Sequence, residues 1–176
     1  MIISVDKAKK LVDLDGWTDE KILMKLKAIE QTIRAYTHNN FQQRECRSTA
    51  NINGGAFLMA SANLFEIGDT IQVSESGLNA GLYTVISVED SALDVAESVK
   101  DENGVLVTRI VYPADVIDCC INLLEWEKKH REKVGIQSET LSRHSVTYFN
   151  QDANNQIMGY PVSLLGCLKA YRKARF

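Results

Sequence analysis

The sequence lacks the short motifs that mark most catalytic, nucleotide-binding and metal-binding sites. It has no GK[ST] element of a phosphate-binding loop and no HExxH element of a zinc protease. Its three histidines, His38, His130 and His144, lie far apart in the chain, and no Cys/His set has the spacing of zinc ligands. We therefore expect no catalytic site, no metal site and no cofactor, and we predict that the chain is not an enzyme.

Long apolar runs and paired cysteines are also missing. No run approaches the roughly 20 apolar residues that a membrane-spanning helix needs, and the N-terminal residues contain no signal-peptide core. None of the four cysteines (Cys46, Cys119, Cys120 and Cys167) belongs to a CxxC pair. Buried, reduced thiols are the favoured interpretation, with zinc ligation or disulfides as alternatives. We expect a protein that is made in a cytoplasm and has no membrane partner.

A strong excess of charge is absent, but the charge is unevenly distributed. The net charge is −3, whereas a protein that binds nucleic-acid phosphates is usually basic. Residues 169–176 nevertheless carry four cations and no acid, and they include Tyr171 and Phe176. Aromatic residues and arginine are enriched at protein interfaces. We predict that this end contacts a protein; exposure to solvent and binding to nucleic acid are the alternatives.

Two segments at the start of the chain have the pattern of capped helices. Ser4 is a suitable N-cap for a short helix, and Thr18 is a suitable N-cap for a second one that ends near Asn39. A third helix is expected to begin at Pro113, because proline is tolerated at the first helical position. Its predicted buried stripe is Ile117, Cys120, Ile121 and Leu124. The apolar positions of the second helix are spaced by four, three, four and three residues: Ile22, Leu26, Ile29, Ile33 and Tyr36.

Between Phe41 and Tyr112 the apolar period changes to two, which is typical of strands. Glycine-containing turns separate the runs, and the pair Asn103-Gly104 predicts a tight hairpin. Several short strands at this spacing predict an antiparallel barrel or sandwich. The predicted fold class is α+β: a helical body with two long helices and a C-terminal helix, and a small antiparallel β-barrel or sandwich inserted between the long helices. The predicted domains are 1–41 with 113–176 for the helical body, and 42–112 for the β module.

A further short strand is predicted at 145–149, after the third helix. It has no obvious hairpin partner beside it in the sequence, and an exposed strand edge must form its backbone hydrogen bonds somewhere. The β module of the same chain and a neighbouring subunit are equally suitable partners. A last helix is predicted from about Ser163 to Arg175.

Three local patterns, taken in order, resemble the head–tail connector (adaptor, or head completion) proteins of long-tailed double-stranded DNA phages. The first runs from Asp15-Gly-Trp-Thr-Asp-Glu to Tyr36-Thr-His-Asn-Asn-Phe. The second is the segment from Gly135 to Tyr148, which is similar to a serine- and glutamate-rich stretch of that family. The third is the close of the chain from Tyr160-Pro161 to Phe176. The strand-rich block from Gln42 to Tyr112 departs from the shorter family members.

The resemblance implies a structural virion protein. Its subunits are expected to form a ring, a dodecamer in most of the family, beneath the portal, to extend the DNA channel, and to join head to tail. The implied partners are the portal protein, neighbouring copies in the ring, the next neck protein (a stopper or tail completion protein), and phage DNA that passes without specific binding. Its expected location is the neck of the virion, after assembly in the cytoplasm of the host bacterium.

The resemblance also implies two sets of site residues. The family's portal-docking segment corresponds here to Leu164, Leu165, Leu168, Lys169, Tyr171, Arg172, Lys173, Arg175 and Phe176. Its subunit-contact or channel segment corresponds to Ser145, Val146, Thr147, Tyr148 and Phe149. Two rival functions stay open at this point. One is a nucleic-acid-binding module that uses the β insert and the basic C-terminal tail, and the other is a small enzyme whose site is assembled at the junction with the insert.

Overall fold

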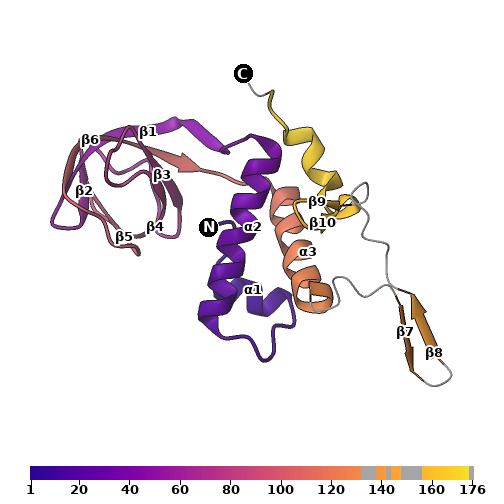
Figure 1. The fold of residues 1–176 in the computed structure, drawn as a ribbon. Helices are drawn as coiled ribbons and strands as arrows, with labels where there is room; N and C mark the ends of the chain where they lie inside the picture. The colour runs from indigo at the N-terminus through magenta and orange to yellow at the C-terminus, as the bar shows by residue number, and fades with distance from the viewer. Residues whose placement is uncertain (132–137, 142–143, 148–155, 175–176) are drawn as a thin grey trace. The chain divides into compact units, whose positions relative to one another are not determined.

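The chain forms two compact units, which we call the barrel unit and the helical unit (Figure 1). The computed structural model describes residues 1–131, 138–141, 144–147 and 156–174, with the backbone alone for 138–141 and 144–147. The barrel unit comprises Met1–Ile2 and Asn39–Tyr112, and the helical unit comprises Ile3–His38 and Pro113–Phe176. Each unit has its own buried core, so each is described separately.

The barrel unit is a closed sheet of six antiparallel strands in the order β1-β2-β5-β4-β3-β6. Closure comes from the pairing of β1 with β6, in which Ser48 lies opposite Val107. A closed sheet has no free edge, so it avoids edge-to-edge aggregation. The strands are β1 (Gln42–Asn53), β2 (Ala56–Met59), β3 (Thr70–Ser74), β4 (Gly81–Val88), β5 (Ala92–Val95) and β6 (Glu102–Ile110).

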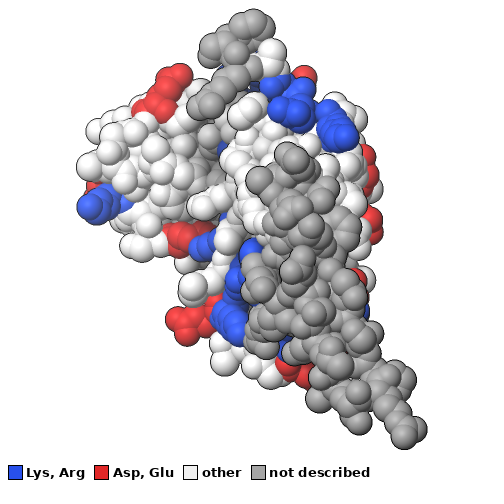
Figure 2. All heavy atoms as spheres, turned by 45° about the vertical axis from the view of Figure 1, so that its right-hand side comes forward, with Lys and Arg blue, Asp and Glu red and all other residues white. Residues whose placement is uncertain are grey.

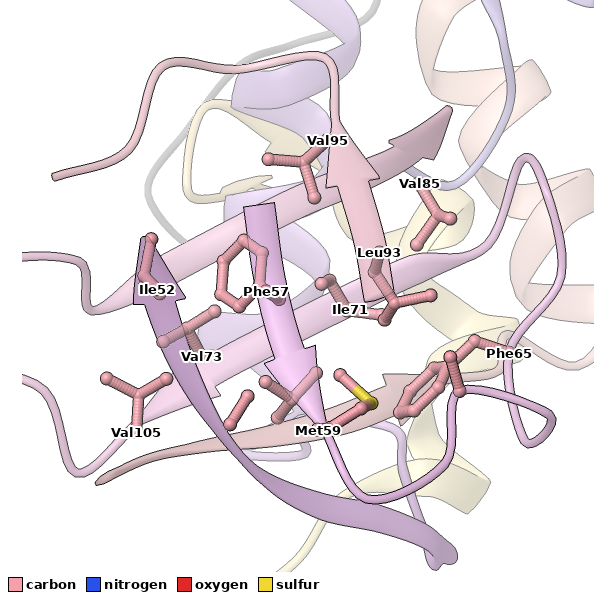
Figure 3. Packing of buried hydrophobic residues seen from close by; sticks show 13 residues of the cluster. Ile52, Phe57, Met59, Phe65, Ile71, Val73, Val85, Leu93, Val95 and Val105 are labelled. Carbon is pink, nitrogen blue, oxygen red and sulfur yellow. The ribbon is translucent and has the colours of Figure 1, made fainter. Parts of the chain in front are cut away.

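All six strands contribute side chains to the barrel interior (Figure 3). The period of two predicted between Phe41 and Tyr112 is seen in β3, where Ile71 and Val73 are buried and Gln72 between them is partly exposed. Phe57 fills the interior with its ring and lies 6.0 Å, edge to face, from the ring of Tyr83. Burying a residue of this size contributes about 1.5–3 kcal/mol. The core also contains Ala50, Ile52, Met59, Ala62, Phe65, Val85, Leu93, Val95, Val105 and Val107.

Glycines with a left-handed backbone form two different features of the barrel, a turn and a bulge. Gly54 and Gly55, with φ of +58° and +91°, form the two-residue turn that joins β1 to β2. The hairpin predicted at Asn103-Gly104 is wrong, because both residues lie inside β6. Ala50 pairs with Val105 and Ile52 pairs with Glu102, so β6 carries one extra residue at this point. The left-handed backbone of Gly104 makes a β-bulge here instead of a turn.

The helical unit begins with two helices that are capped as predicted, α1 (Val5–Leu11) and α2 (Asp19–Thr37). The side-chain oxygens of Ser4 and Thr18 accept hydrogen bonds from the N–H groups of Lys7 and Lys21, at 3.2 and 3.3 Å. α2 lies beside α3 (Ala114–His130) in Figure 1. The predicted apolar seam of α2 is confirmed, since all its members are buried: Ile22, Leu26, Ile29, Ile33 and Tyr36.

The predicted buried stripe of α3 is confirmed in part. Cys120 and Leu124 are fully buried, whereas Ile117 and Ile121 are only partly buried. Pro113 is the N-cap rather than the first helical residue. The buried residues of the helix are Val116, Cys119, Cys120, Leu123, Leu124 and Glu127.

The rest of the helical unit consists of two small hairpins and a 3-10 helix. β7 (Ser138–Leu141) pairs with β8 (His144–Thr147), and β9 (Gln156–Ile157) pairs with β10 (Tyr160–Pro161). The 3-10 helix η2 (Val162–Tyr171) follows directly.

The predicted fold class is wrong. The structure is not a helical body with two long helices and a small insert, because a closed six-stranded barrel with its own core forms a unit comparable to the helical one. The helices are short, with 7, 19 and 17 residues, and the predicted C-terminal α-helix is a 3-10 helix of 10 residues. The size of the barrel was underestimated from the sequence because its two shortest strands, β2 and β5, have four residues each and are too short to show a period of two.

Candidate functional site

The predicted docking residues at the C-terminal end fall into two groups. Leu165 and Leu168 of η2 are fully buried, at 0% exposure, and η2 packs against α3 and α2. They belong to the core of the helical unit and cannot contact a partner. Leu164 is partly buried, and its carbonyl oxygen accepts a hydrogen bond from the Cys119 thiol. The amphipathic pattern alone could not separate residues that face a partner from residues that face their own chain.

The end of η2 is held in place by polar contacts as well. The Tyr171 hydroxyl donates to the carboxylate of Asp115 at the start of α3, at 2.6 Å, and this hydrogen bond raises the pKa of Tyr171. The Arg172 guanidinium lies 5.2 Å from the centre of the Tyr36 ring. The backbone N–H of residue 173 donates to the carbonyl of Thr37 at 2.8 Å. The path of the chain through 173 is therefore fixed on the helical unit.

Three of the predicted docking residues, Lys169, Arg172 and Lys173, are exposed on this fixed segment, and we call them the basic strip. Arg175 and Phe176 lie outside the described residues. Over the face seen in Figure 2, basic and acidic side chains are scattered among uncharged ones. The basic strip is distinguished by its position at the end of an anchored segment in which residues 169–174 include no acid.

The two units differ in charge. Residues 39–112 contain four basic and ten acidic side chains, which gives the barrel segment a formal charge of −6. The rest of the chain contains 16 basic and 13 acidic side chains, a charge of +3. A surface that binds the phosphate backbone of DNA gains its affinity from clustered Lys and Arg. The barrel has the opposite character.

The segment predicted to contact a neighbouring subunit lies in the β7–β8 hairpin. Ser145, Val146 and Thr147 are paired with Thr140, Glu139 and Ser138 in an antiparallel register. The expectation that this strand has no partner beside it in the sequence is therefore wrong. The partner strand, Ser-Glu-Thr-Leu, was missed because it has no apolar alternation. Tyr148 and Phe149 lie outside the described residues.

A buried ionic network occupies the helical unit, and no pattern in the sequence predicted it. The Glu127 carboxylate of α3, with its side chain 1% exposed, accepts a hydrogen bond from Lys25 of α2 at 2.7 Å. It also accepts from Arg131, one turn further along α3, with Nε at 3.0 Å. The Tyr160 hydroxyl of β10 bonds to the same carboxylate. One carboxylate therefore connects α2, α3 and the β9–β10 hairpin.

Arg131 also makes the aromatic contacts of this network. Its guanidinium lies 4.9 Å from the Trp126 ring centre and 5.2 Å from that of Tyr160, and it donates to the Gly159 carbonyl at 3.3 Å. In the sequence, Arg131 precedes and Tyr160 follows the segment that contains β7 and β8. The Glu127–Arg131 spacing of four residues on one helix was visible in the sequence, but the burial that makes it important was not.

The network sets the acidity of its members. Burial alone would raise the pKa of Glu127, but hydrogen bonds from Arg131, Lys25 and Tyr160 lower it to about 2. The pKa of Tyr160 is raised, first by burial and then by its hydrogen bond to Glu127. Glu127 is therefore ionised at any pH near neutrality, as a structural anion must be to hold two cations.

This acidity predicts how stability changes with pH. Since the pKa of Glu127 in the folded chain is below its usual value of 4.5, its contribution is present above about pH 5 and is lost as the pH falls toward 2. The contribution is on the order of 3 kcal/mol. Urea unfolding of the wild type and of Glu127→Gln between pH 7 and pH 3 should show a steeper acid loss in the wild type. If the free energy of unfolding fell equally with pH in the two proteins, the lowered pKa of Glu127 would not account for the acid loss.

A hollow in the barrel unit is lined by carboxamide and carboxylate side chains together with Ile52 and Leu58. The carboxylate of Glu102, one of the lining residues, accepts hydrogen bonds from the Ser76 hydroxyl and from the Gly77 N–H, the latter at 2.7 Å. Its pKa is lowered, chiefly by the hydrogen bond from Ser76. Asn79, which is buried, ties the same loop to Lys100 with bonds of 2.8 and 2.9 Å. These groups hold the β3–β4 loop, and the arrangement is structural.

Within the described ranges, no group of three or more His, Cys, Asp and Glu side chains is arranged to hold a metal ion. Among the same residues, no helix has the length and apolar character needed to cross a bilayer. Comparison of the sequence with protein-family models and with curated proteins gave no match in either case.

Proposed function

We propose that this chain is a structural subunit in the neck of a tailed bacteriophage, where copies of it form a ring beneath the portal and join the head to the tail. It catalyses no reaction in this role. Its partners are the portal protein, its own neighbours in the ring and the next protein of the neck, and phage DNA passes through the ring without being held. The first support is the order of sequence patterns that resemble the connector family.

The observation that carries the proposal is the basic strip on its anchored segment. Lys169, Arg172 and Lys173 are exposed, while Leu165 and Leu168 beneath them are buried. Because the backbone is fixed before any partner binds, little conformational entropy is lost on docking. Exposed cations in a fixed arrangement are suited to an acidic protein surface, and we assign that surface to the portal.

The β7–β8 hairpin supports contact between copies. A two-stranded sheet is marginally stable by itself, and among the described residues neither of its strands pairs with a third. Such edges accept a further strand through backbone hydrogen bonds. A neighbouring subunit in a ring would supply that strand.

The charge of the barrel argues against the nucleic-acid-binding alternative. With a formal charge of −6 on residues 39–112, the barrel repels a phosphate backbone instead of neutralising it. The same repulsion suits a channel component, since DNA that is bound tightly would be slow to leave the head. The basic strip has only three cations, Lys169, Arg172 and Lys173, with which it could contact DNA phosphates.

The test is to mix the purified chain with the portal protein of the same phage and to examine the mixture by sedimentation and negative-stain electron microscopy. We expect a layer of extra density on the portal and co-sedimentation of the two proteins. A parallel titration with duplex DNA is expected to show weak binding only. Failure to associate with the portal, together with tight DNA binding that weakens steeply with salt, would replace the proposal by the nucleic-acid alternative.

A further inference from the structure

Two cysteines of the helical unit meet at one backbone carbonyl. The Cys119 Sγ of α3 lies 3.4 Å from the Leu164 oxygen, and the Cys167 Sγ of η2 lies 3.7 Å from the same oxygen. The two sulfur atoms therefore cannot be further apart than the sum of those distances, and the two thiols are close enough to hydrogen-bond to each other. Residues 119 and 167 are far apart in the sequence, so the fold creates this pair.

The two thiols differ in access to solvent. Cys167 is exposed, whereas Cys119 is 1% exposed. Burial, and after it the hydrogen bond with Cys167, raises the pKa of the Cys119 thiol, so it is a poor nucleophile by itself. In a disulfide-forming pair, the exposed thiol reacts first and forms a mixed disulfide with the oxidant, and the second thiol then attacks that mixed disulfide.

Cys120 provides an internal comparison. It is the next residue on α3 and is fully buried, and burial, followed by the charge of Glu30, raises its pKa to about 12. Successive residues on a helix point about 100° apart, so Cys120 does not share the Leu164 carbonyl. Cys46, the remaining cysteine, belongs to β1 of the barrel unit.

We propose that Cys119 and Cys167 form a reversible intrachain disulfide when the protein meets an oxidant of the low-molecular-weight disulfide class. The Cys167 thiolate attacks one sulfur of the oxidant and releases one thiol, which leaves a mixed disulfide on Cys167. The Cys119 thiolate then attacks the Cys167 sulfur and releases the second thiol. In total, the protein loses two protons and two electrons, and the oxidant is reduced to two thiols.

The consequence is a covalent tie between α3 and η2. The disulfide would hold η2 against α3. It would also lower the conformational entropy of the unfolded chain, so the oxidised protein should have a higher free energy of unfolding than the reduced one. The inference concerns the chemistry of this chain and does not depend on the proposed function.

The experiment uses full-length C46S protein, which removes the barrel thiol, treated with oxidised glutathione. We expect loss of two of the three remaining thiols, a cross-linked peptide that joins residues 119 and 167, and a higher midpoint of urea unfolding. C46S/C167S should form no intrachain cross-link, and C46S/C120S should behave as C46S. Because Cys167 is exposed, its substitution is not expected to disturb folding, and circular dichroism checks this.

Three outcomes would overturn the inference. The first is a stable glutathione adduct on Cys167 with no second thiol lost. The second is a cross-link that joins Cys120 instead of Cys119. The third is an unchanged yield of cross-link in C46S/C167S.

Discussion

The double variant K169E/K173E should lose association with the portal by at least about a hundredfold, which corresponds to about 3 kcal/mol. Two exposed cations of the basic strip become anions, so attraction to an acidic surface turns into repulsion. Arg172 is left in place because its guanidinium lies over the Tyr36 ring. The measurement is binding to immobilised portal protein at physiological salt.

The matched control is K7E/K10E. It makes the same change of charge on exposed residues of α1 in the same unit, but away from the basic strip in the sequence. Binding within about threefold of the wild type is expected, as for charges outside a contact. If both double variants lose binding equally, overall charge explains the association and the basic strip has no special role.

Replacing Glu127 by alanine should destabilise the helical unit by about 3 kcal/mol, the lower part of the range for removing one partner of a buried ion pair. The lower value is expected because the side chains of Lys25 and Arg131 are 34% and 37% exposed and regain some hydration. Both tryptophans, Trp17 and Trp126, lie in the helical unit. Urea unfolding followed by tryptophan fluorescence therefore reports on this unit.

The control is Glu125→Ala, on the same helix. Glu125 pairs with Lys129 at the same four-residue spacing, but both side chains are exposed by more than 40%. An exposed pair contributes about 0.5 kcal/mol or less. Equal effects of the two substitutions would mean that burial of Glu127 gives it no special importance.

The local features of the helices could be predicted from the sequence because they depend on neighbours in the chain. Ser4 and Thr18 cap helices through N–H groups three residues away, and the α2 seam needs only the 3.6-residue period. The face of α3 could not be predicted as reliably. Ile117 was expected to be buried and is only partly so, whereas Glu127 is buried, because its carboxylate is paired there with Arg131 of the same helix and Lys25 of α2.

The tertiary features could not be predicted from the sequence pattern either, because they depend on contacts between residues that are distant in the chain. Asn103-Gly104 fits a hairpin turn and a bulge equally well, and the pairing of β6 with β1 decides between them. Leu165 and Leu168 fit a docking helix and a core helix equally well, and packing against α2 and α3 decides. Closure of the barrel depends on registers between strands that are distant in the chain, which no local period specifies.

Cryo-electron microscopy of the chain mixed with its portal would show directly whether copies of the chain assemble there. We expect a ring of copies on the portal, with Lys169 and Lys173 against acidic portal side chains and the β7–β8 hairpin of each copy beside its neighbour. A complex in which the barrel faces the portal and the C-terminal segment points away, or a chain that remains monomeric beside bare portals, would contradict it.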